Sequence, residues 1–124
     1  MRTIYFLAAM AAWALTAGAA AAAEPARAKA NLAAFFTDAD YPAEAIAAKE
    51  QGEVGFTLEV GADGRVAGCL ITRSSGSSAL DSATCRVLGA RARFTPARDS
   101  NGMPAQDRVA GRIRWTLPAP PAAG

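Results

Sequence analysis

Residues 53–73 decide the fold, and they read EVGFTLEVGADGRVAGCLITR. In the first half, apolar residues alternate with polar or small ones, which is the period of a half-buried β-strand; the apolar set is Val54, Phe56, Leu58 and Val60. Asp63-Gly64 interrupts the alternation, and this dipeptide is a strong signal for a hairpin turn. We therefore predict two antiparallel strands. The second, from Arg65 to Arg73, has apolar residues at odd and even positions, so we expect it to be covered on both faces.

A short helix is predicted before this hairpin. Pro42 suits the first turn of a helix, and Ala43 to Gln51 contains good helix formers. Ala43, Ile46 and Ala47 fall on one stripe, which we expect to face the core. Gly52 is expected to end the helix as the residue just beyond its last turn.

A second helix is predicted after the hairpin, from about Ala79 to Ala90. Its apolar stripe recurs at helical spacing and consists of Leu80, Ala83, Thr84, Val87 and Leu88. Ser78 is expected to cap its N-terminus, and Asp81 lies in its first turn, where a negative charge is favourable. The serines from Ser74 to Ser78 are expected to form the capping turn.

A last strand is predicted from about Asp107 to Leu117. Val109, Ile113 and Trp115 would point inward, whereas Arg112 and Arg114 would point outward. The order helix, strand, strand, helix, strand predicts an α+β fold, with two helices packed on a three-stranded sheet that contains antiparallel pairs. A right-handed crossover would place the last strand beside the first, at the edge of the sheet.

The two ends of the chain are expected to lie outside this domain. Residues 1–23 combine Arg2, an uncharged apolar run and three closing alanines, which is typical of a secretory signal peptide. The run is also long enough for an uncleaved membrane anchor facing the periplasm. Residues 24–40 are expected to be a lead segment, flexible at first and then docked in extended form through Phe35 and Phe36. Residues 118–124 are expected to be a disordered tail.

Composition excludes several classes of function. The chain contains no histidine, the commonest general base and zinc ligand, and we expect no catalysis, no metal site and no cofactor. The formal charge of +2 is small and the arginines are dispersed, so nucleic-acid binding has no electrostatic support. In an oxidising compartment, Cys69 and Cys85 are expected to form a structural disulfide between strand and helix.

Four blocks in order resemble the C-terminal domain of the TonB family. They are Tyr41-Pro42-x-x-Ala45; Gly52-x-Val54 with Val60-x-x-Asp63-Gly64-x-Val66; Ser74-Ser75-Gly76-x-x-x-Leu80-Asp81; and Phe94-x-Pro96 followed by Gly102-x-Pro104. The similarity runs from about Asn31 to Leu117, and the domain is expected to span residues 41–117.

The resemblance implies a periplasmic domain that binds a partner and contributes to transmembrane transport. The implied partner is the N-terminal segment of a TonB-dependent outer-membrane receptor, which would add as a strand to the sheet edge. The contact residues would then be Arg108, Ala110, Arg112 and Arg114. The alternative is a structural envelope protein in which these charges only protect the edge from aggregation. An exposed edge also permits a homodimer.

Overall fold

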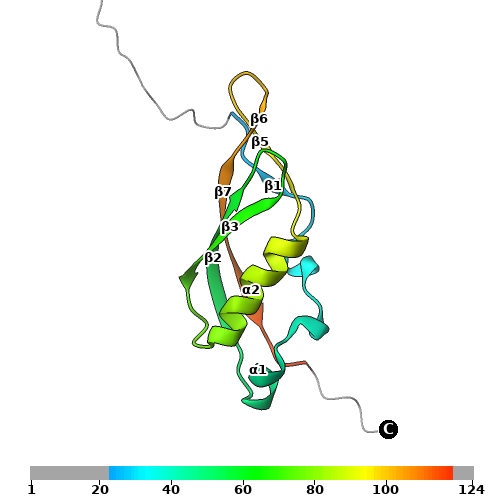
Figure 1. The fold of residues 1–124 in the computed structure, drawn as a ribbon, viewed down its shortest axis with the longest axis vertical. Coiled ribbons are helices and arrows are strands. Elements are labelled where there is room, and N and C mark those ends of the chain that lie inside the picture. Colours follow the sequence, from blue (N-terminus) through cyan, green and yellow to red (C-terminus); the bar gives the residue numbers. More distant parts are fainter. Residues whose placement is uncertain (1–22, 119–124) are drawn as a thin grey trace, which may run out of the picture.

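The computed structural model describes residues 23–118, and its elements follow in chain order (Figure 1). They are β1 (Arg27–Ala28), the 3-10 helices η1 (Leu32–Phe35) and η2 (Asp38–Asp40), α1 (Ala43–Ala47), β2 (Gly52–Val60), β3 (Val66–Arg73), α2 (Ser78–Arg91), β4 (Phe94–Thr95), β5 (Ala97–Arg98), β6 (Pro104–Ala105) and β7 (Asp107–Trp115). The predicted α+β class and the order of the main elements are confirmed.

The main sheet has three antiparallel-paired strands in the order β3-β2-β7. β2 and β3 form the predicted hairpin, in which Gly64 has φ +80°. A Cβ at Gly64 would collide with the carbonyl oxygen of Phe94, so the turn requires glycine both for its backbone angle and for space. The chain then crosses through α2 and returns as β7 beside β2. The prediction that the last strand lies at the sheet edge, beside the first of the three predicted strands (β2), is therefore confirmed.

The core lies between the sheet and α2. All four alternating residues of β2 are buried, and so are the five stripe residues predicted for α2. Helix α2 begins one residue earlier than predicted, and Ser77 is its cap: the Ser77 hydroxyl accepts from the Leu80 N–H at 3.2 Å. The expectation of a Ser78 cap was therefore wrong by one residue.

The prediction for α1 was wrong in length and in buried face. The helix stops at Ala47, and only Ala45 is buried within it, whereas Ile46 is 44% exposed. Lys49, with φ +54°, takes the left-handed conformation that was expected of Gly52, and Gly52 instead begins β2. Two hydrogen bonds stabilise the reversal of the backbone at this point. The Tyr41 hydroxyl donates to the carbonyl of Glu50, and the Glu50 N–H donates to the carbonyl of Ala45.

The segment predicted to be a flexible lead is part of the folded structure. β1 pairs antiparallel with β4, and Glu24 pairs with Arg98 through two backbone hydrogen bonds. Residues 32–35 form a 3-10 helix and not an extended segment. Phe35 and Phe36 nevertheless pack against the core as predicted.

β3 is covered on one face only, contrary to the prediction. Leu70 is 66% exposed, because it lies in one row with Thr57 and Ala110 on the face of the sheet turned away from α2. We call this face the open face. Its members alternate with the core-facing residues along each strand, and those on β2 are Glu53, Gly55, Thr57 and Glu59, of which Gly55 is buried because it has no side chain.

Within residues 23–118, no helix is both long and apolar enough to cross a membrane. The apolar run assigned to a signal peptide or anchor ends at Ala23 and otherwise lies outside the described residues, as does nearly all of the tail 118–124.

Candidate partner-binding edge

β7 offers a regular, unpaired edge. Its nine residues pair one-to-one with β2, from Trp115 opposite Gly52 to Asp107 opposite Val60, with no interruption. Among the described residues, β7 has no other neighbouring strand and no further backbone–backbone hydrogen bond. Alternate N–H and C=O groups along the outer side of β7 are therefore free to pair with an added strand.

The opposite edge of the sheet is irregular. β3 carries two residues without a partner in β2, Ala67 and Thr72, where the register with β2 shifts. Only Gly68 to Ile71 pair without interruption. Bulges of this kind twist an edge and break the row of groups that a new strand would need. The two edges thus differ in their capacity to accept a partner.

The four residues predicted to contact a partner all lie on β7. Arg108, Ala110, Arg112 and Arg114 are exposed and project from the open face, while Ile113 and Trp115 between and beyond them are buried. The predicted alternation is confirmed. Arg108 lies near Glu59, with 3.6 Å between guanidinium and carboxylate, and both side chains are well exposed. Contact of these four residues with a partner stays a prediction.

A pocket of about 320 Å³ opens at the C-terminal half of this edge. One wall is β7 from Arg112 to Trp115, and the other is the segment between Asn31 and Tyr41, including Phe36 and Asp38. The sequence interpretation missed this pocket because its two walls are more than 70 residues apart in the chain. The only available signal was the apolar character of Phe35 and Phe36, which indicated docking without indicating where.

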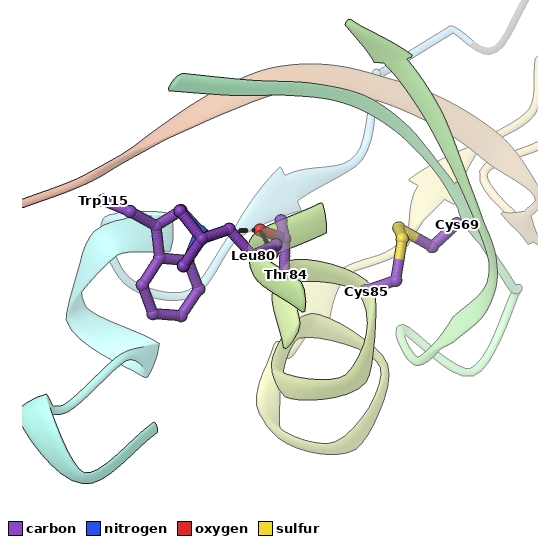
Figure 2. Close-up of a disulfide and its surroundings, with 5 residues drawn as sticks. All are labelled: Cys69, Leu80, Thr84, Cys85 and Trp115. Carbon is purple, nitrogen blue, oxygen red and sulfur yellow. Dashed lines mark hydrogen bonds between the residues drawn. A yellow bond between two sulfur atoms is a disulfide. The ribbon is translucent and has the colours of Figure 1, made fainter. Parts of the chain in front are cut away.

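Trp115 fixes the wall formed by β7. Its indole N–H donates to the Thr84 hydroxyl at 2.8 Å, and that hydroxyl donates to the carbonyl of Leu80 at 2.8 Å, so the end of the strand is bonded to α2 (Figure 2). The rings of Phe36 and Tyr41 meet the indole edge-to-face, at centroid distances of 5.3 and 5.2 Å. Tyr41, Phe94 and Trp115 are buried, and the inward direction predicted for Trp115 is confirmed.

An ion pair fixes the opposite wall. Arg91, at the end of α2, donates two hydrogen bonds to the buried carboxylate of Asp40, at 2.6 and 2.7 Å. These bonds lower the pKa of Asp40 to about 2; burial opposes the shift, and hydrogen bonds from Thr37 add to it. The sequence interpretation did not find this pair, which holds η2 and the neighbouring pocket residues against the helix.

The predicted disulfide is present. Cys69 of β3 and Cys85 of α2 are bonded, with 5.6 Å between their Cα atoms (Figure 2). The bond attaches the bulged edge strand to the helix that covers the inner face. It therefore stabilises the side of the sheet opposite β7.

The serine-rich turn is a helix cap, as predicted. The hydroxyls of Ser74 and Ser75 and the N–H of Ser75 donate to the carboxylate of Asp81. Although burial acts to raise it, these bonds hold the pKa of Asp81 below its usual value. The hydroxyls of Ser74, Ser75 and Ser77 are thus occupied in holding this turn to the N-terminal part of α2. In the part of the chain that the structure describes, no three His, Cys, Asp or Glu side chains are grouped to hold a metal ion.

Comparison with known families agrees with this geometry. The family model described as Gram-negative bacterial TonB protein C-terminal matches residues 37–117. A search of curated proteins gave no significant match. The match spans well over half of the chain, and the resemblance seen in the four sequence blocks is confirmed. The chain belongs to the TonB C-terminal family, a family of non-enzymatic binding domains of the Gram-negative envelope.

Proposed function

We propose that this protein acts in the periplasm as a binding domain without catalytic activity, and that β7 accepts an extended segment of a partner by strand addition. The proposed partner is the N-terminal segment of a TonB-dependent outer-membrane receptor. Through this contact the protein would contribute to transport across the outer membrane. Family membership supports the class of partner, and the free edge supports the mode of binding.

The contrast between the two sheet edges carries the proposal. An added strand gains affinity from a row of main-chain hydrogen bonds, and this gain requires a long edge in regular register. β7 provides nine consecutive residues, whereas β3 provides four between its bulges. The disulfide further attaches β3 to α2. The partner segment should therefore pair with β7.

The proposed location rests on two features of the chain. Residues 1–23 have the pattern of an export signal, with cleavage proposed after Ala23. The Cys69–Cys85 bond suits an oxidising compartment such as the periplasm. Mass spectrometry of protein isolated from the envelope would test the location, because the proposed mature form lacks residues 1–23 and two cysteine hydrogens. An intact N-terminus would indicate membrane anchoring instead.

A peptide titration tests strand addition. A peptide with the sequence of a receptor N-terminal segment is compared with two derivatives, each N-methylated on one of the two alternating sets of amides. Only one set faces β7 in an added strand, so one derivative should lose binding and the other should keep it. The purified full chain is titrated by NMR, with amide shifts followed along β7. Equal binding of both derivatives would exclude strand addition.

The same titration addresses the alternative of a structural envelope protein. If no receptor segment binds and no β7 amide shifts, the exposed arginines of β7 serve only to protect a free edge from self-association. In that case Arg112→Ala should increase oligomerisation of the purified chain, and neither the wild type nor the variant should bind a receptor peptide. Receptor-peptide binding that shifts β7 amides, or unchanged oligomerisation of Arg112→Ala, would contradict this alternative.

A further inference from the structure

The open face carries an uncompensated pair of arginines beside the binding edge. Arg73 of β3 and Arg112 of β7 lie directly opposite Gly55, one on each side of β2. Gly55 has no side chain to separate them, and the Cβ of Arg73 lies 3.0 Å from where a Cβ of Gly55 would stand. The two arginines thus belong to one cross-strand row whose centre is a glycine.

These charges have no acidic partner in the folded domain. Within residues 23–118, the ion pairs are Arg91 with Asp40 and Arg108 with Glu59. Arg112 and Arg73 are exposed and outside both pairs, and Arg114 lies across from Glu53 without forming one. The C-terminal half of the β7 edge is therefore positive on the open face. A residue of an added strand directly opposite Arg112 would have its Cβ within about 5.5 Å of the Cβ of Arg112.

The other face of the same edge is apolar. Ile113 and Trp115 point away from the open face and line the pocket, together with Phe36 and Tyr41. Because side chains of a strand alternate between faces, the residue next to the one opposite Arg112 would point toward this pocket. The pocket lining includes the guanidinium-bearing Arg112 and Arg114 and one carboxylate-bearing residue, Asp38, so its rim is positive on balance.

We infer that β7 selects an extended segment with an acidic residue opposite Arg112 and an apolar residue next to it, opposite Ile113, whose side chain enters the pocket. This inference rests on the proposed function, because it assumes that a strand adds to β7. It goes further by assigning Arg112 and the pocket as the elements that choose the sequence of that strand. The acidic side chain completes the Arg73–Gly55–Arg112 row, and the apolar side chain extends the aromatic contacts around Trp115.

A reciprocal charge exchange tests the acidic position. A peptide alternating acidic and apolar residues is compared with one that has Lys at the acidic positions, using the full chain and its Arg112→Glu variant. The wild type should bind the acidic peptide about fivefold to tenfold more tightly, because opposite charges across a strand pair attract and like charges repel. The variant should show the reverse preference. Arg86→Glu is the matched control: Arg86 is exposed on α2, on the other side of the sheet, so its reversal should leave the preference unchanged.

Replacing the apolar residue opposite Ile113 tests the pocket. Leu→Ser in the peptide at that position should weaken binding about tenfold or more, since burial of a leucine side chain is lost. A second peptide carries Leu one residue further along, on the open face, in place of the acidic residue there, and Leu→Ser at that position should change affinity less than threefold. Equal effects at the two positions would refute the assignment of the pocket.

The outcomes separate this inference from the proposed function. If the acidic and the lysine-containing peptides both shift the β7 amide signals and bind with equal affinity, the inferred sequence preference is wrong, whereas strand addition to β7 is retained. A preference that Arg112→Glu fails to reverse would overturn the role of Arg112. If neither peptide nor any receptor segment shifts β7, both the inference and the proposed function fail.

Discussion

Thr84→Val is the substitution that tests most directly how the end of β7 is held. Thr84 is fully buried, and its hydroxyl is the acceptor for the indole N–H of Trp115, which is itself only 5% exposed. Valine keeps the approximate shape of threonine and removes this acceptor. The indole N–H is then buried without a partner, which costs about 1–3 kcal/mol. The free energy of unfolding should fall by about 2 kcal/mol, and Tm by roughly 10 °C for a domain of this size.

The assay is urea and thermal unfolding followed by circular dichroism. Thr95→Val is the matched control, because Thr95 is exposed in β4 and its side chain makes no hydrogen bond in the described part of the chain. It should change stability by less than about 0.5 kcal/mol. A double-mutant cycle isolates the bond. In a Trp115→Phe background there is no indole N–H, so Thr84→Val should cost at least about 1 kcal/mol less.

Two results would refute this reasoning. If Thr84→Val is as mild as Thr95→Val, the hydroxyl does not support the indole. If the effects of Thr84→Val and Trp115→Phe simply add, then the two side chains contribute to stability independently, and the end of β7 is held by ring packing alone.

Three further predictions concern stability. Reduction of the disulfide should lower the free energy of unfolding by about 3 kcal/mol, measured as the shift in urea midpoint with and without reductant; an unchanged midpoint would contradict it. The pKa of Asp40 is depressed to about 2, so its contribution to the free energy of unfolding is present above the unfolded pKa of 3.8 and is lost as pH falls toward 2. This loss should be about 1–2 kcal/mol in the wild type. It should be absent in Asp40→Asn. Gly111→Ala should lower the free energy of unfolding by about 1–3 kcal/mol, since the new Cβ would lie 2.9 Å from the ring of Phe56. The control Gly89→Ala, in open space on α2, should not destabilise the protein. Equal effects of the two substitutions would argue against crowding at Gly111.

The features that sequence predicted well are those determined by local periodicity. The alternation from Val54 to Val60 identified β2, and Asp63-Gly64 located the hairpin. The second helix was predicted from its apolar stripe with a period of 3.6 residues. Its disulfide bond to β3 was predicted from the two cysteines. The periodic and turn signals each lie within a few neighbouring residues, so tertiary packing had little scope to override them, and the two cysteines are only 16 residues apart.

The features that sequence missed depend on contacts between distant segments. β1 has two residues and exists only because β4 pairs with it, about 65 residues later. The α1 stripe was wrong because a five-residue helix has too little length for periodicity to decide its buried face. The bulges of β3 follow from its register against β2, which composition does not encode.

The candidate site was predicted only in part, because one part of it follows from a local pattern and the rest depends on contacts between distant segments. The outward arginines of β7 follow from simple alternation, and their exposure was foreseen. The pocket beside them requires residues 31–41 to dock against the last strand, and the Asp40–Arg91 pair that secures this docking joins residues far apart in the chain. Neither could be inferred from one local pattern.

The proposed function depends on a partner strand that adds to β7 and not to β3. Amide hydrogen exchange of the full chain, measured with and without a receptor N-terminal peptide, tests it most directly. We expect alternate amides from Asp107 to Trp115 to gain protection when the peptide binds, while amides from Val66 to Arg73 exchange as before. Protection gained along β3 with β7 unchanged would contradict it.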